Sequence, residues 1–249
     1  MLQWIVLSVG GCVGLRAESE VFSIKYEILY KDAFPVVKCD LQQGEVIQAE
    51  SDAMVAMSKT LDVDGSMNGN LLGGLARRFL AGESFFFQKI VASRGPGYVL
   101  LGHSAPGGII DVVLDGSYKL RVQKNGFLAA TQGINVGTTV QNLAQGFLSR
   151  EGFFILDIGG QGTVFLSSFG AIHAINLEPG EEIVVDNGHL VAWADYMNYK
   201  IEKASNGWIS SIMSGECLVC RFTGPGIVLI QTRNPSSFSS WIKGLTSTN

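Results

Sequence analysis

Short runs of β-branched, aromatic and other apolar residues recur along the chain, and Gly, Asn, Asp and Pro separate them at intervals of about 8–12 residues. Several runs alternate apolar and polar residues, as a strand with one buried face does. The clearest runs cover residues 23–30, 45–51, 107–116, 117–123, 126–132, 180–188 and 189–195. This spacing is typical of a β-sandwich or barrel, and it predicts an all-β protein.

Glycine-containing motifs mark the turns between these strands. Asn125-Gly126 and Asn187-Gly188 stand between apolar runs, where Asn-Gly favours the positive φ angles of a type I′ hairpin turn. Ser51-Asp52 occupies about the same place nearer the N-terminus. A strand rather than a helix follows three glycine triplets, which favours tight turns over phosphate-binding loops. These triplets are Gly95-Pro96-Gly97, Gly160-Gln161-Gly162 and Gly224-Pro225-Gly226.

One sequence signature occurs three times at nearly even spacing. It consists of a glutamate, an apolar run and a closing glycine that is followed two residues later by valine. The closing glycines, 65 and 64 residues apart, are Gly97, Gly162 and Gly226. A leucine before a glycine turn also recurs, at Leu41, Leu114 and Leu177. The chain is therefore predicted to contain three copies of one structural unit.

The first copy is longer because it carries a glycine-rich insert at residues 65–82. With this insert placed, the sequence predicts three tandem repeats between two terminal segments. The predicted divisions are an apolar N-terminal segment at 1–20, repeats at 21–104, 105–169 and 170–235, and a C-terminal tail at 236–249. Short helices are predicted only at Leu71–Leu80, Val140–Leu148 and Pro235–Leu245, the last with Ser236 or Ser237 as its N-cap.

Composition and charge narrow the function classes. The chain of 249 residues is 47% hydrophobic and 16% charged, with a net charge of −4 and 18 Lys and Arg residues. This balance disfavours nucleic-acid binding driven by phosphate contacts. Four cysteines in a chain of this length do not make a disulfide framework, so a reducing, cytoplasmic setting is expected.

The first fifteen residues carry no charge, but they are fewer than the ~20 that a membrane-spanning helix needs. They also lack the basic n-region of a signal peptide. An extra edge strand or a start-site artefact is favoured over a membrane anchor.

Reactive residues do not form a recognisable catalytic or metal-binding motif. Cys217 and Cys220 have CxxC spacing, but no second pair accompanies them, and residues three apart on a strand point to opposite faces. Buried small side chains are favoured over a metal or redox site. His103, His173 and His189 are isolated from acids and nucleophiles, which favours ordinary turn or strand positions over ligation. No catalytic residue, cofactor site or metal site is therefore predicted.

Other polar and aromatic clusters have structural explanations. The carboxylates Asp111, Asp115, Glu178, Glu181 and Glu182 flank predicted turns, where solvated acids are expected. The triple phenylalanine at residues 85–87 and the pair at 153–154 favour burial on both faces of a strand, one of them in a subunit interface. The sequence motif Arg77-Arg78-Phe79 in the insert is the candidate interaction site.

Five segments together carry a family resemblance: GGLARRFLAGESFFF, GPGYVLL, GQGTVFLSSFGAI, VVDNGHLVAW and FTGPGIVLIQTRNP. In this order, from about Phe22 to Pro235, they are similar to the altered inheritance of mitochondria protein 24 family. The resemblance implies that each repeat is like one subunit of the tryptophan RNA-binding attenuation protein, a β-sandwich of the short double-stranded β-helix type. It also implies that three chains close a ring, and it implies no catalytic residues.

Two functions remain open. The first is a non-enzymatic scaffold or binding protein that acts as a ring-shaped homo-oligomer, a trimer, and contacts a protein or membrane-associated partner through the insert. The second is a small-ligand or RNA-binding protein that uses clefts between the β repeats. The RNA version lacks support from charge, because the repeated signatures contain no Lys or Arg at equivalent positions.

Overall fold

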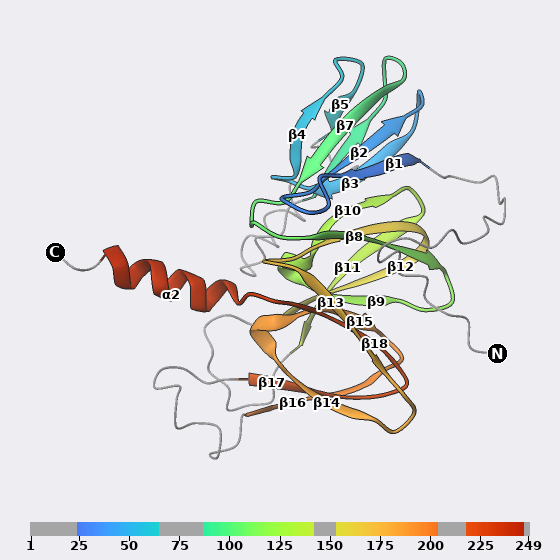
Figure 1. Cartoon of the computed structure of the whole chain (residues 1–249). Helices are drawn as coiled ribbons and strands as arrows, with labels where there is room; N and C mark the ends of the chain where they lie inside the picture. The colour runs from blue at the N-terminus through green and yellow to red at the C-terminus, as the bar shows by residue number, and fades with distance from the viewer. Residues whose placement is uncertain (1–23, 65–86, 142–152, 204–217, 247–249) are drawn as a thin grey trace. The chain divides into compact units, whose positions relative to one another are not determined.

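Strands dominate the computed structural model, as the alternation of apolar runs and turns predicts (Figure 1). The structure describes residues 24–64, 87–141, 153–203 and 218–246. The predicted helix Leu71–Leu80 and most of Val140–Leu148 lie outside these residues. The all-β prediction is confirmed.

The chain forms two compact units, which we describe separately. Unit 1 comprises the described residues within 1–115, 127–134 and 160–167, and unit 2 comprises those within 116–126, 135–159 and 168–249. The second predicted repeat, 105–169, therefore contributes strands to both units. The repeat boundaries themselves stay a prediction.

Unit 1 contains one four-stranded sheet, in the order β1-β2-β7-β4, and a second set of pairings that runs from β8 to β5. Its complete strands are β1 (Lys25–Leu29), β2 (Val36–Leu41), β3 (Val46–Glu50), β4 (Met54–Met57), β5 (Asp62–Asp64), β6 (Phe87–Val91), β7 (Gly97–Gly102), β8 (Ile109–Asp115) and β10 (Phe127–Thr131). The second half of β12 (Phe153–Ser167) pairs with β8 and β10, β10 pairs with β3, and β6 lies between β3 and β5. β2 and β3 alternate buried and half-buried residues, as the sequence pattern predicts.

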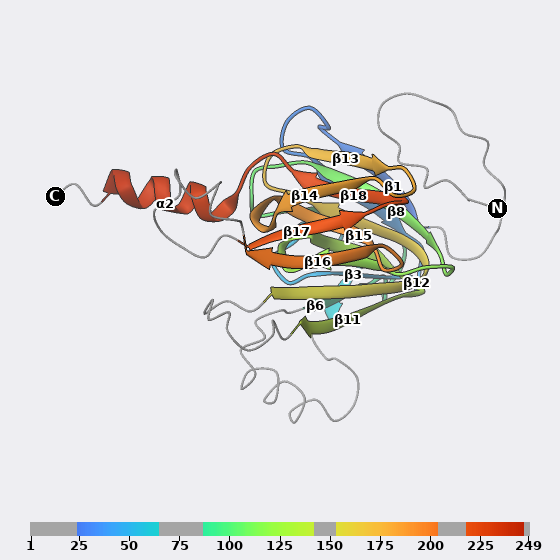
Figure 2. The same cartoon turned by 90° about the horizontal axis from the view of Figure 1, so that it is seen from below.

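Unit 2 contains a three-stranded sheet in the order β14-β17-β16, whose strands lie side by side in Figure 2. Its second set of pairings runs from β13 through β18, β15 and β9 to the first half of β12, which also pairs with β11. The strands are β9 (Leu120–Gln123), β11 (Ile134–Gln141), β13 (Ile172–Leu177), β14 (Glu182–Asp186), β15 (Leu190–Ala194), β16 (Asn198–Lys203), β17 (Leu218–Thr223) and β18 (Gly226–Gln231).

The same strand pairing occurs three times along the chain. In residues 24–102, β7 pairs with β2 and β4, while β6 pairs with β3 and β5. In the last copy, β18 pairs with β13 and β15, while β17 pairs with β14 and β16. In the middle copy, the two halves of β12 take both roles. Each copy is also joined to the next, because β10 pairs with β3 and β15 pairs with β9.

The Asn-Gly hairpin prediction is wrong. The two motifs form 3-10 turns, η1 (Lys124–Gly126) and η2 (Asn187–His189), and neither glycine has a positive φ. A type I′ turn joins two strands that pair with each other, whereas β14 pairs with β17 and β15 pairs with β9 and β18. At η2 the Asp186 carboxylate accepts a hydrogen bond from the Gly188 amide at 2.7 Å. The motif therefore directs the chain from one sheet to another.

The closing glycines lie where no side chain fits. A Cβ atom at Gly97 would lie 2.5 Å from Leu61, one at Gly162 would lie 2.6 Å from Thr131, and one at Gly226 would lie 2.6 Å from Met197. The first and last follow a turn and begin a strand, as predicted. The predicted turn at Gly160-Gln161-Gly162 is instead a bend inside β12, where the two glycines have φ angles of 106° and 148° and the strand continues without a reversal.

The predicted C-terminal helix is confirmed as α2 (Pro235–Thr246). Its N-cap is Asn234 rather than Ser236 or Ser237, because the Asn234 side-chain oxygen accepts hydrogen bonds from both of their amides at 2.9 and 3.2 Å. Pro235 then takes the first helical position, where a missing N–H has no consequence. No helix of the described part of the chain is long and apolar enough to span a membrane.

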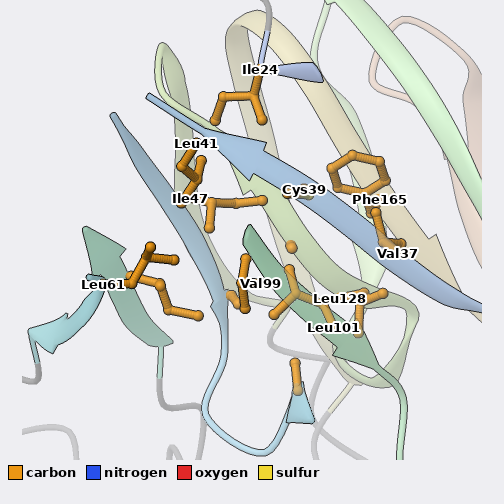
Figure 3. Packing of buried hydrophobic residues seen from close by; sticks show 14 of the residues in the cluster. Ile24, Val37, Cys39, Leu41, Ile47, Leu61, Val99, Leu101, Leu128 and Phe165 are labelled. Carbon is orange, nitrogen blue, oxygen red and sulfur yellow. The ribbon is translucent and has the colours of Figure 1, made fainter. Parts of the chain in front are cut away.

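Each unit has an apolar core. In unit 1, Val37, Cys39, Val99, Leu101 and Phe165 are fully buried and belong to one cluster (Figure 3). In unit 2, the core is centred on Trp193, whose ring lies 5.1 Å from Tyr199 and 5.5 Å from Phe222 in edge-to-face geometry. Packing of this kind fixes the sheets of each unit.

Candidate functional site

Strand β4 exposes apolar side chains that equivalent strands bury. β4, β10 and β15 each pair with a strand that follows a closing glycine, and each pairing has a register shift at the second residue of the strand. All five residues of β10 and of β15 are buried. In β4, by contrast, Val55 is 61% exposed and Met54 is 37% exposed. Val55 stands where β10 has Leu128 and β15 has Val191.

The difference follows from strand pairing. β10 lies between β12 and β3, and β15 lies between β18 and β9. Within the described residues, β4 pairs with β7 alone and forms the edge of its sheet. Among the described residues, the outer edge of the β4 backbone and the side chains beside it therefore have no neighbouring strand of the kind that covers β10 and β15.

Strand β14 is the complementary edge. Its equivalents β3 and β9 receive β10 and β15 as neighbours, whereas β14 pairs only with β17 among the described strands. Val184, at the centre of β14, is 44% exposed. The inner face of the same strand is covered, because Val185 and its pairing partner Cys220 are both buried.

The junction between β9 and β15 shows which contacts form when such an edge is paired with a neighbouring strand. Trp193 lies opposite Arg121 in the ladder. The Arg121 guanidinium lies 5.3 Å from the centre of the Tyr199 ring and 3.6 Å from the Asp157 carboxylate. Two hydrogen bonds lie beyond the last ladder pair. The Lys119 amide donates to the Asp195 carboxylate at 3.0 Å, and the Asp195 amide donates to the Lys119 carbonyl at 2.9 Å.

The sequence-predicted interaction residues Arg77, Arg78 and Phe79 lie outside the described residues. So do Cys12 and Cys217, which leaves the CxxC pair with one described member. That member, Cys220, is a free thiol, and burial raises its pKa to about 12, with the nearby Asp186 as a smaller cause. A thiol with this pKa is protonated at neutral pH and is a poor nucleophile or metal ligand.

The three histidines are separate, as their spacing predicts. His103 accepts a hydrogen bond from the Ala105 amide at 3.1 Å, and burial lowers its pKa. His189 contacts the Gln231 carbonyl through Nδ1 at 2.8 Å. His173 is exposed on β13. In the part of the chain that the structure describes, no three His, Cys, Asp or Glu residues come together in a way that could hold a metal ion.

The singled-out carboxylates have structural partners. The Glu181 side chain accepts a hydrogen bond from the Glu178 amide at 2.9 Å, and Glu45 does the same for Gln42 at 2.7 Å in the equivalent turn of the first copy. Asp111 accepts a hydrogen bond of 2.8 Å from the Tyr26 hydroxyl. Burial and this contact raise the pKa of Tyr26. These acids fix turns and strand pairs.

A shallow pocket lies over the outer sheet of unit 2. It has a volume of about 280 Å³ and is lined by Glu182, Asn198, Tyr199, Lys200, Arg221 and Thr223. Arg221 lies 3.7 Å from Glu182 and 3.4 Å from Glu202, so its charge is already balanced. The pocket is open and polar.

The apolar residues of β4 and β14 were missed by sequence reasoning. Their signal was present, because Val55, Leu128 and Val191 occupy one repeat position and all are apolar. The sequence alone does not show which strands pair between copies. The structure shows that a neighbouring strand covers this position in the second and third copies and leaves it open in the first.

The family model described as mitochondrial biogenesis AIM24 matches residues 26–233, which includes both edges and all three copies of the pairing. The chain belongs to the AIM24 family. This confirms the resemblance found in the sequence.

Relatives in the AIM24 family share most of the chain. An uncharacterised protein of Streptococcus pyogenes serotype M6 is 31% identical over 217 residues, which are 84% of this chain and 86% of that protein. The crystal structure of a Streptococcus pyogenes protein is similar with a TM-score of 0.75 and 30% identity, covering 90% of this chain and all of that one. The fold described above is therefore the fold of an experimentally known relative.

Proposed function

We propose that this AIM24-family chain is a non-enzymatic scaffold or binding protein that acts as a ring-shaped homo-oligomer, with a trimer as the expected form. The observation that carries the proposal is the exposed apolar row of β4, since equivalent rows in the same chain are covered by a neighbouring strand. Exposed sheet edges favour association with a further strand. A head-to-tail contact that closes on itself gives a ring.

We also propose that each repeat corresponds to one subunit of the tryptophan RNA-binding attenuation protein. The support is the threefold recurrence of one pairing scheme, with the same register shift in β4, β10 and β15. Three such repeats in each of three chains would build one larger ring from equivalent parts. A cytoplasmic setting is part of the proposal and is supported by the free thiols of Cys39 and Cys220.

The non-enzymatic part of the proposal is supported by how the polar side chains are used. Glu181, Asp111 and Asp186 each accept a hydrogen bond that fixes a turn or joins two strands. The buried thiols are held in the protonated form. A fold alone does not decide function, so the proposal rests on these local roles.

Native mass spectrometry of the full-length chain tests the proposal. We expect a trimer, and we expect it to persist at physiological salt because the edge contacts are largely apolar. A monomer at the highest soluble concentration would contradict the ring. Partner capture with wild type and with an Arg77→Ala/Arg78→Ala variant tests the insert, because an unchanged set of partners would remove it from the proposal.

The alternative is binding of a small ligand or RNA in clefts of the repeats. The observation in its favour is the pocket of unit 2, whose lining includes two cations, Lys200 and Arg221, the second of them paired with Glu182 and Glu202. Fluorescence-anisotropy titration with pooled RNA at low salt tests the RNA version, and flat curves would contradict it. A small molecule carried through gentle purification would appear as added mass in the same native spectra.

A further inference from the structure

We propose that β4 of one copy pairs antiparallel with β14 of a second copy, in the register that joins successive repeats inside the chain. This inference rests on the proposed self-association and assigns its interface. The partner is a second copy of this chain, because the chain itself shows twice which strand covers the β4 position: β3 covers β10, and β9 covers β15. The next strand in that series along the chain is β14.

The register follows from the two joints that the structure contains. At one joint, Ala129 lies opposite Ala49. At the other, Ala192 lies opposite Val122. Ala56 occupies the same position after the register shift of β4 as these two alanines do in β10 and β15. Transferring the pattern places Ala56 opposite Val185, Met57 opposite Val184, and Ser58 opposite Ile183 of the second copy.

Apolar side chains support this register. Met57 and Val184 would take the places of Trp193 and Arg121, so two aliphatic side chains would meet where the chain has an aromatic ring and a long aliphatic stem. Val191 approaches η1, since a Cβ atom on Gly126 would lie 3.1 Å from its side chain. By equivalence, Val55 would approach η2 of the second copy. Its exposure of 61% would then be removed.

Charge supports the register independently of hydrophobicity. Beyond the β9–β15 ladder, Lys119 and Asp195 stand opposite each other and exchange hydrogen bonds. The equivalent positions at the new joint are Lys59, two residues after β4, and Glu182, the first residue of β14. Both are exposed in the single chain. In the proposed register the Lys59 ammonium comes near the Glu182 carboxylate, which in the single chain lies 3.7 Å from Arg221.

Other sheet edges do not have this support. β5, β11 and β16 are equivalent to one another, and each pairs within the described residues only with its own repeat. Nothing in the chain shows a neighbour for that position. β8 and β13 are also edges, and their equivalent β2 pairs on its far side with β1, which lies in the same predicted repeat as β2. β4 and β14 are the edges whose equivalents pair with a strand of another repeat. Because β4 and β14 are different surfaces, the contact is head-to-tail. Each copy pairs through its β4 with one neighbouring copy and through its β14 with another.

Cysteine cross-linking of the full-length protein tests the pairing. Cys12 and Cys217 are replaced by serine, and Met57→Cys and Val184→Cys are introduced singly and together. Directly opposite residues of antiparallel strands have Cβ atoms about 4.5–5.5 Å apart, which a short thiol-reactive linker spans. The doubly substituted chain should give linked multimers, and a mixture of the two single variants should give linked dimers. Val113→Cys with Val184→Cys is the control, since Val113 is exposed on β8 outside both edges.

A blocking variant measures the contribution of the same contact. Val184→Lys places a charge at the centre of the proposed joint, at a site exposed enough for the single chain to tolerate it. We expect self-association to weaken by at least about tenfold, because an unpaired charge would be buried. Lys59→Glu should weaken association less, and adding Glu182→Lys should recover part of the loss. Circular dichroism checks that each variant is folded.

The outcomes separate this inference from the proposed function. A wild-type monomer in native mass spectra would overturn both. A wild-type oligomer that Val184→Lys leaves unchanged, without cross-links between positions 57 and 184, would overturn the pairing and leave the oligomer standing. Dimers linked through Met57→Cys alone would show β4 against β4 and would also overturn it. So would a cross-link confined within one chain.

Discussion

Strands β15 and β4 occupy the same position in their repeats, yet one is buried and the other is an edge. Both pair with the strand after a closing glycine, and both have the register shift at the second residue. Val191 of β15 is buried, whereas Val55 of β4 is 61% exposed. The comparison teaches that the burial of an edge strand is decided by its neighbour, while its own sequence only makes burial favourable.

The two strands also differ in the side chain that they place beside the neighbouring strand. β15 carries Trp193, which fills the core of unit 2 and lies opposite Arg121. β4 carries Met57 at this position, a flexible side chain that tolerates partial exposure and still packs against the core of unit 1. Substitutions at equivalent positions can therefore separate the effect of the neighbour from the effect of the residue.

The largest difference in the free energy of unfolding is expected when aspartate replaces the valine at the register shift of each strand, Val191 in β15 and Val55 in β4. Val191→Asp would bury an unpaired carboxylate and should lower the free energy of unfolding by about 5 kcal/mol, enough to unfold many domains. Val55→Asp should change it by less than about 1 kcal/mol in protein diluted to the monomer. Urea titration of both variants measures this. Equal losses would show that β4 is covered in the single chain.

The next largest loss of unfolding free energy is expected for Trp193→Ala. It removes a fully buried ring that contacts Tyr199 and Phe222, and such truncations lower the free energy of unfolding by about 3–5 kcal/mol. Met57→Ala, the matched change in β4, should remove about 1 kcal/mol or less in the monomer. Thermal and urea unfolding of the pair provide the measurement. If Met57→Ala lowered the free energy of unfolding by about as much as Trp193→Ala, the expected difference between β4 and β15 would be contradicted.

Each unit has a buried thiol on an inner strand, Cys39 on β2 and Cys220 on β17. Burial raises the pKa of Cys39 and of Cys220 from 9.0 to about 12. Folded chains therefore keep these protons at pH values where unfolded chains have lost them. The contribution to stability should be complete below pH 9 and should be lost as the pH rises toward 12. Unfolding free energies of wild type and of Cys39→Ala and Cys220→Ala variants across this range test it, and parallel curves would contradict it.

The smallest effect is expected at the joint between β9 and β15. Arg121→Ala removes the contacts with the Tyr199 ring and Asp157 and should lower the free energy of unfolding by about 1 kcal/mol, because the side chain is only half-buried. Gln48→Ala is the matched change at the joint between β3 and β10 and should have less effect. A double-mutant cycle with Tyr199→Phe and Tyr199→Ala would show whether the ring carries the interaction.

Much of the fold could be predicted from the sequence because its signals are local. β-branched runs between turn residues located the strands, and the closing glycines showed the repeat. The Asn125-Gly126 and Asn187-Gly188 motifs misled because turn type depends on whether the flanking strands pair with each other, and here they enter different sheets. Ser236 and Ser237 were predicted as caps, but Pro235 serves well as a first helical residue, so the helix starts before both serines and Asn234 is the cap.

Less of the candidate site could be predicted. Val55 and Val184 look like ordinary strand residues, and only the pairing of β10 with β3 and of β15 with β9 shows that their edges are incomplete. Pairing between repeats depends on contacts that are far apart in the chain, and no local pattern encodes them. The isolation of the histidines could be predicted, since no motif spacing linked them to other groups.

The closing glycines have a consequence for how such a chain can change over time. At Gly97, Gly162 and Gly226, a side chain would collide with different neighbours, namely Leu61, Thr131 and Met197. Each copy has therefore built its own contacts around the missing atom, so relief of the collision in one copy does nothing for the other two. The side chains around this position differ between the three copies, while the same backbone position excludes a side chain in each of them.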